Sequence, residues 1–199
     1  MKLIMSPASP YVRKVRVLIR EAGLADRVEE HAITTTPLDT APEAIAANPL
    51  GRIPALVRAD GPAIHDSRVI CRYLDDIAGA GLYPDSALWE VLTLEATAEG
   101  LLDSAVTMVY ETRFRGEAAW APWLDAQWAK IDRALNAFEA LWLSHLAGPL
   151  TMGQIATGCA LGYLDFRHGD RDWRGTRPAL AAWYSGFADR PAMQATAPA

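Results

Sequence analysis

The chain has 199 residues, of which 51% are hydrophobic and 22% are charged, a balance typical of globular proteins. Its net charge of -5 at pH 7 offers no basic surface for a nucleic acid or an anionic membrane. No apolar run in the chain is long enough to span a bilayer. The chain has two cysteines without a CxxC spacing, which excludes a disulfide framework. We therefore expect a cytoplasmic protein that binds neither nucleic acid nor membrane.

Short apolar runs alternate with turn signals up to about residue 80. The spacing predicts a strand over 2–5, a helix from Ser9-Pro10 to Gly23, a strand over 28–33, a helix over 42–47, strands over 55–57 and 62–64 around Asp60-Gly61, and a helix over 69–77. This β-α-β-α-β-β-α order combines a right-handed parallel crossover with an antiparallel hairpin. It predicts a mixed sheet of the thioredoxin-like kind.

Helical spacing dominates the second half of the chain. After a linker over 79–84, helices are expected around 88–106, 124–142, from a capping box at Thr151, and over 180–187. We expect a thioredoxin-like domain with a mixed sheet over residues 1–79, followed by an all-helical bundle over residues 86–199.

Ser9-Pro10 lies where a strand gives way to a helix. The simplest interpretation is an N-cap with proline at the first helical position. The same geometry also suits chemistry, because a hydroxyl at a helix N-terminus can donate to a thiolate that the helix dipole favours.

Two further segments have both a structural and a functional interpretation. The segment Asn48 to Pro54 is either a rigid loop or one with a cis Ile53-Pro54 bond, which would present the Ile53 backbone to a peptide-like ligand. Asp66 and Ser67 either cap the next helix or hold a zwitterionic amino-acid group, the helix amides taking its carboxylate and Asp66 its ammonium.

Taken together, these three segments resemble the glutathione transferase family. The matching elements are SPYVRK from Ser9, NPLGRIPAL from Asn48 and DSRVI from Asp66. They are similar to the family's Ser/Cys-Pro-Phe start, its N-P-x-G-x-[IV]-P segment and its [ED]-S-x-x-I segment. The family continues with an all-helical domain of about this length, so the resemblance covers the whole chain.

The resemblance implies a role for each segment. Ser9 would activate the glutathione sulfur as the catalytic residue, and Ile53 before a cis Pro54 would pair with the cysteinyl part. Asp66 and Ser67 would hold the γ-glutamyl end, and Arg52 could meet the glycyl carboxylate. The second substrate, a small hydrophobic electrophile, would lie against the helix that contains Tyr110 and Arg113, although these side chains could equally be core.

We expect glutathione as co-substrate, no metal, since the four histidines lack ligand spacing, and a homodimer by the family's habit. Two alternatives stay open. One is a binding or regulatory protein that keeps the fold without turnover. The other is a glutathione-dependent peroxidase, isomerase or lyase. One departure from the family is Gln154, which stands where the later helix usually has Asp.

Overall fold

The computed structural model describes residues 1–198 and divides them into two compact units. The first comprises Met1–Pro84 and the segment that begins at Pro191, and the second comprises Asp85–Arg190. The sequence predicts a helical domain that continues to residue 199, whereas the structure groups the last segment with the first unit.

A four-stranded mixed sheet forms the centre of the first unit. Its strand order is β2-β1-β3-β4, in which β1 is parallel to β2 and antiparallel to β3, and β3 is antiparallel to β4. The strands are β1 (Lys2–Met5), β2 (Glu29–Ala32), β3 (Ala55–Val57) and β4 (Ile64–His65). This arrangement confirms the predicted thioredoxin-like order.

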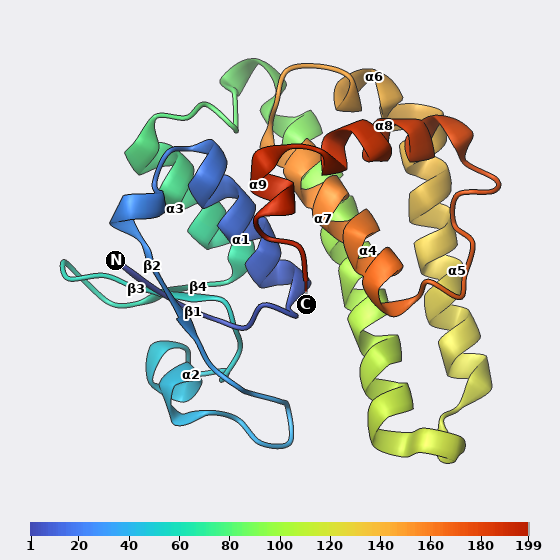
Figure 1. The fold of residues 1–199 in the computed structure, drawn as a ribbon, viewed down its shortest axis with the longest axis horizontal. Coiled ribbons are helices and arrows are strands. Elements are labelled where there is room, and N and C mark those ends of the chain that lie inside the picture. Colours follow the sequence, from blue (N-terminus) through green and yellow to red (C-terminus); the bar gives the residue numbers. More distant parts are fainter. Residues whose placement is uncertain (199) are drawn as a thin grey trace. The chain divides into compact units, whose positions relative to one another are not determined.

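Helices lie on both faces of this sheet, α1 and α3 on one and α2 on the other (Figure 1). The helices are α1 (Pro10–Glu21), α2 (Pro42–Ala47), α3 (Ser67–Ala78) and a short 3-10 turn over Ala25–Arg27. Successive side chains of a strand point to opposite faces of the sheet, so the apolar residues of one strand can pack against helices on both faces. Ile4 and Ala55 pack with Ala47 of α2, and all three are buried.

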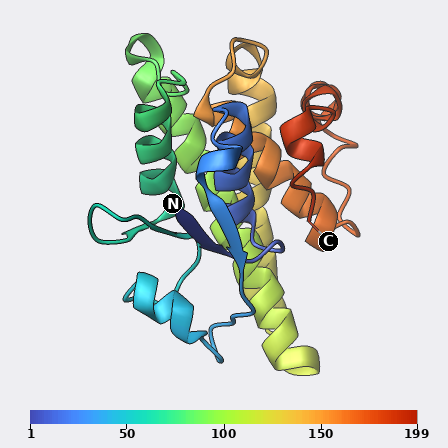
Figure 2. The ribbon, with the colours of Figure 1, turned by 60° about the vertical axis from the view of Figure 1, so that its left-hand side comes forward.

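The regular elements of the second unit are all helical among the described residues (Figure 2). It comprises α4 (Leu88–Arg115), α5 (Ala121–Ala137), a π-helical turn (Phe138–Trp142), α6 (Leu143–Leu146), α7 (Met152–Arg167), α8 (Pro178–Ala188) and 3-10 turns at Asp85–Ala87 and Gly116–Ala118. The predicted 124–142 helix thus changes to π geometry at Phe138. The predicted capping box is present, with Gln154 Oε1 accepting from the Thr151 amide at 2.8 Å.

The helix α9 (Pro191–Gln194), which packs on α1, was not predicted. Met193 is buried with 1% of its surface exposed, and its carbonyl accepts a hydrogen bond from Arg13 Nη2 at 3.1 Å. The segment is short and apolar, so periodicity could not separate it from the end of the preceding helix.

A charged cluster joins α1 to β2. Arg16 Nε and Arg20 Nη1 donate to the two carboxylate oxygens of Glu30 at 2.8 and 2.6 Å. Burial alone would raise the pKa of Glu30, but the hydrogen bonds and charges of Arg20 and Arg16 lower it below its usual 4.5.

We expect Glu30→Gln to reduce the free energy of unfolding at pH 7 by on the order of 1 kcal/mol. Because the folded-state pKa is depressed, this contribution is complete above the unfolded value near 4.5 and is lost as the pH falls through the lower folded value. Urea titrations across that range should show the two curves converging under acid. Glu29→Gln, next to it and exposed, is the matched control, and an equal loss there would contradict the assignment.

Candidate active site

The sheet register brings the three predicted site segments of the first unit to one edge. Ile4 of β1 pairs with Ala55 of β3, and Ala55 pairs with His65 of β4. The chain leaving β1 toward Ser9, the chain entering β3 through Ile53 and the chain leaving β4 toward Asp66 therefore meet at the same end of the sheet. Segments that lie between residues 9 and 67 of the sequence thus form one candidate site.

Ser9 is the N-cap of α1, with extended backbone angles, and Pro10 follows at the first helical position. Its Oγ accepts a hydrogen bond from the Val12 amide at 3.4 Å. A serine hydroxyl has one hydrogen to donate besides the lone pairs that accept. The cap therefore leaves the Ser9 proton available to an anion at the helix N-terminus, so its structural and chemical roles are compatible.

Asn48 shapes the loop that leads into β3, a role that the sequence interpretation missed. Only 3% of its surface is exposed, and its side chain accepts from the Leu50 amide at 3.0 Å and donates to the Arg52 carbonyl at 2.9 Å. Gly51 has a φ of +62°, and a Cβ there would lie 2.6 Å from Thr40 Cγ2. An asparagine two residues before a turn amide is a known side-chain turn signal, so the pattern was readable.

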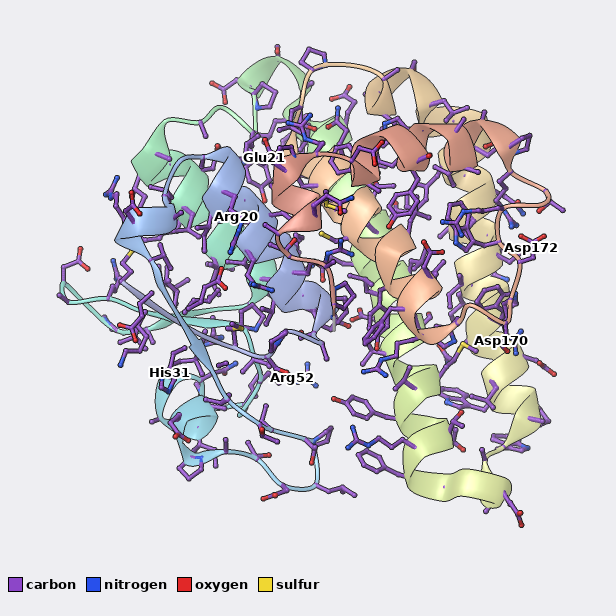
Figure 3. All side chains as sticks on the ribbon, in the orientation of Figure 1. Arg20, Glu21, His31, Arg52, Asp170 and Asp172 are labelled. Atoms are coloured by element: carbon purple, nitrogen blue, oxygen red, sulfur yellow. The ribbon has the colours of Figure 1, made fainter. Side chains whose placement is uncertain are left out.

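The peptide bond between Ile53 and Pro54 is cis, as the sequence predicts. Within residues 1–198, neither the amide nor the carbonyl of Ile53 takes part in a hydrogen bond. The guanidinium of Arg52 is exposed and also has no partner there. Figure 3 labels Arg52 on the loop between α2 and β3. The loop therefore offers a peptide-like edge with a cation beside it.

Asp66 is the N-cap of α3, and its φ of 69° is unusual for a residue other than glycine. Its Oδ1 accepts from the Arg68 amide at 2.9 Å, and the Arg68 side chain donates to both carboxylate oxygens at 3.2 and 2.9 Å. These bonds, against the opposing effect of burial, lower the pKa of Asp66 to about 2. Asp66 is thus a permanent anion, and Ser67 after it is buried.

Lys14 and Arg68 are charged neighbours that sequence reasoning did not assign. Lys14 is fully buried in the second turn of α1, and its charge contributes to the low pKa of Asp66. Burying an ammonium group costs free energy unless polar or charged groups interact with it. The core around Lys14 must therefore supply such groups. Nothing in a lysine one residue after Arg13 distinguishes it from a surface lysine in the sequence.

The two second-substrate candidates belong to the second unit. Tyr110 and Arg113 are three residues apart on α4 and so share a helix face. Tyr110 is half-buried and stacks on Phe114, whereas Arg113 is exposed. Neither side chain is part of the buried core, so the interpretation of this pair as core residues does not hold.

Metal-ligand clusters and membrane-spanning helices are both absent from residues 1–198. No group of three or more His, Cys, Asp or Glu side chains is arranged to hold a metal ion there. Over the same residues, no helix combines the length and the apolar character needed to cross a membrane. Both cysteines, Cys71 and Cys159, are buried.

Comparison with known proteins agrees with this fold. Residues 8–77 match the glutathione S-transferase N-terminal domain and residues 121–186 match the C-terminal domain. The chain is 30% identical to the uncharacterized GST-like protein YibF of Escherichia coli K12, over 100% of this chain and 98% of that protein.

Two solved structures of a glutathione transferase family member from Pseudomonas fluorescens Pf-5 are similar throughout. Both are 46% identical and cover 100% of this chain. One, with bound glutathione, has a TM-score of 0.96 over 98% of its length. The other, with bound S-(propanoic acid)-glutathione, has a TM-score of 0.92 over 100% of its length. In fold, in domain composition and in sequence, this chain belongs to the glutathione S-transferase family.

Proposed function

We propose that the protein is a glutathione transferase that stabilises the glutathione thiolate for attack on a small hydrophobic electrophile. Ser9 donates a hydrogen bond to the sulfur, and the amides and dipole of the α1 N-terminus favour its negative charge. The thiol proton passes to solvent, the sulfur forms a bond to the electrophilic carbon, and the leaving group departs with its electron pair.

The observation that supports this most is the single sheet edge where complementary groups meet. Glutathione is a tripeptide with a zwitterionic γ-glutamyl end, a cysteinyl thiol and a glycyl carboxylate. The unpaired main chain of Ile53 suits the cysteinyl peptide unit, and Arg52 suits the glycyl carboxylate. Asp66 suits the ammonium, and the N-terminus of α3 at Ser67 suits the γ-glutamyl carboxylate.

Relatives add support of a different kind. The Pseudomonas fluorescens protein was solved with glutathione and with S-(propanoic acid)-glutathione, so a protein 46% identical to this one binds both free and S-substituted glutathione. A site that accepts both forms suits a transferase. By family likeness, we also propose that the protein acts as a cytoplasmic homodimer in detoxification.

Calorimetric titration with reduced glutathione tests the binding site directly. We expect saturable binding of one glutathione per subunit, and about 2 kcal/mol weaker binding in Asp66→Ala, because a charged partner of the ammonium is removed. Asp60→Ala, on the β3–β4 hairpin of the same unit, is the control and should bind as the wild type does. The absence of binding at millimolar glutathione would refute the proposed function, and unchanged affinity in Asp66→Ala would remove that residue from the site.

A further inference from the structure

A pocket in the first unit lies at the end of the sheet opposite the candidate active site. Arg27 comes just before β2 and Arg58 just after β3. Because Lys2 of β1 pairs with Glu29 of β2 and with Val57 of β3, both arginines lie at the end where β1 starts (Figure 1). The pocket that they line has a volume of about 440 Å³, within the range of about 300–1,000 Å³ that is typical of small-molecule sites.

The position of Arg58 in this pocket is set by the β3–β4 hairpin and by α3. Its Nε donates to the Pro62 carbonyl at 3.1 Å, and its guanidinium lies 5.5 Å from the centroid of the Tyr73 ring. A Cβ on Gly61 would lie 2.6 Å from Arg58 Nη2, so a glycine there lets the hairpin approach the guanidinium closely. Asp60 Oδ1 lies 3.8 Å from Arg58 Nη1, beyond hydrogen-bond distance. Arg58 is therefore oriented but keeps hydrogen-bond donors for a ligand.

Arg27 supplies a second guanidinium group to the pocket. Its side chain is exposed, and among residues 1–198 it takes part in no hydrogen bond, ion pair or ring contact. Its carbonyl accepts from the Met1 nitrogen at 2.9 Å, which ties its backbone to the start of β1. Within the described residues, the pocket lining contains two arginines and one acid, Asp60. Cationic charge therefore prevails in the pocket, which favours an anion.

The wall of the pocket that α3 supplies is apolar. Tyr73 and Ile77 lie four residues apart on α3, so they share a helix face, and both are half-buried. Met1 and Ala59 also line the pocket. A ligand that fills this space would therefore combine an anionic group with an apolar body.

We propose that this pocket binds a small organic phosphate monoester, at a site separate from the proposed glutathione site. Two guanidinium groups suit a phosphate, because its three terminal oxygens can accept hydrogen bonds from both. A carboxylate has two oxygens, which a single guanidinium already engages. The apolar body of the ligand lies against Tyr73 and Ile77. The pocket and its ligand are independent of the proposed transferase function.

Calorimetric titration with phenyl phosphate and with benzoate tests the pocket. The two probes share the ring but differ in the anionic group, and above pH 7 the phosphate carries close to two negative charges. We expect one phenyl phosphate to bind per chain, about tenfold more tightly than benzoate. Saturating glutathione should leave this affinity within about twofold, because the two ligands bind at opposite ends of the sheet. Competition between phenyl phosphate and glutathione would overturn the assignment to this pocket.

Three variants separate the pocket from net charge. Arg27→Gln should weaken phenyl phosphate binding by about tenfold. Asp60→Ala should strengthen it by about threefold, because it removes the acid that competes for Arg58. Arg72→Gln is the matched control, since it removes the same charge from α3, where the guanidinium lies 4.6 Å from the centroid of the Tyr83 ring. It should bind phenyl phosphate as the wild type does.

The outcomes that would overturn the proposal are distinct from those that test the transferase. Equal losses of phenyl phosphate affinity in Arg27→Gln and Arg72→Gln would show that net charge attracts the anion without the pocket. Equal affinities of the wild type for phenyl phosphate and benzoate would refute the phosphate assignment, and the absence of saturable binding at about 10 mM phenyl phosphate would refute the site. Each of these results would leave glutathione binding and conjugation untouched.

Discussion

Ser9→Ala should bind glutathione almost as tightly as the wild type but should raise the pKa of the bound thiol by about 1 to 2 units. The reason is that a hydrogen bond to a charged acceptor contributes about 1.5–3 kcal/mol, and one pKa unit corresponds to about 1.4 kcal/mol. At neutral pH the bound sulfur would then be mostly protonated. We therefore expect kcat for conjugation to fall by about ten- to a hundredfold.

The measurement is a pH titration of the enzyme–glutathione complex, followed by thiolate absorbance, with kcat recorded over the same range. The sign follows from the direction of the shift. A raised thiol pKa moves the whole kcat profile to higher pH, so the variant should recover activity as the solution becomes alkaline. A profile that is lowered without being moved would show that Ser9 does not act on the thiolate.

Capping complicates this experiment, because Ser9 also accepts from the Val12 amide, and removing that bond costs about 1 kcal/mol of stability. Ser9→Asp separates the two roles, since aspartate caps helices well but has no proton to donate at neutral pH. It should preserve stability and still raise the thiol pKa. Ser6→Ala controls for the nearby hydroxyl, whose residue lies before the helix, and should change neither quantity.

Much of the first unit was predictable because its local sequence signals favour the same elements that the tertiary fold contains. The strand over Lys2–Met5 and the helix over Pro42–Ala47 have the predicted limits. A proline opens α2, and Asn48-Pro49 cannot continue it, so both ends are set by backbone chemistry. The hairpin was predicted as well, but its loop is longer than a turn at Asp60-Gly61 requires, since Arg58–Ala63 joins the two strands.

The electrostatics of the site were less predictable than its position. The spacing of Asp66 suggested a cap and an ammonium partner, but its ion pair with Arg68 depends on a positive φ that the sequence does not disclose in a non-glycine residue. The burial of Lys14 likewise depends on what packs over α1. Charge pairing is set by tertiary geometry, whereas caps and turns are set within a few residues.

In the second unit, the charge pairing of the stretch from Arg167 to Arg177 also depends on tertiary geometry. Its mixed charges are typical of a solvated loop, yet Arg177 is 4% exposed and donates to Asn136 Oδ1 at 3.0 Å. Asp165 accepts from Trp173 Nε1 at 2.9 Å and from Arg174. Asp165 of α7 and the Arg177 bonds to α5 thus anchor the loop to two helices, a long-range arrangement that composition alone cannot reveal.

The other large effect is expected at the end of the chain. Met193→Ala should lower the free energy of unfolding by about 3 kcal/mol, which is typical of truncating a fully buried methionine. For a protein of this size, each 1 kcal/mol lowers Tm by about 2–4 °C, so Tm should fall by roughly 6–12 °C. Met193→Leu, which conserves volume, is the matched control and should cost less than about 1.5 kcal/mol.

The position of α9 gives this stability effect a functional consequence. The Met193 carbonyl accepts from Arg13, which is 6% exposed, and the Arg13 Nε atom is buried with no partner of its own. Loss of α9 would leave that guanidinium with fewer hydrogen bonds in a buried position, which is costly for a charged group. Arg13 lies one turn after Ser9 on α1 and donates its amide to the Ser9 carbonyl at 3.0 Å.

A chain that ends at Arg190 should therefore bind glutathione more weakly, because the helix that presents Ser9 has lost a buried support. Differential scanning calorimetry with and without glutathione measures both effects on the same sample. We expect the truncated chain to melt at a lower temperature and to gain less from glutathione than the wild type does. If truncation lowers Tm but leaves the glutathione-induced increase unchanged, α9 stabilises the fold without holding the site.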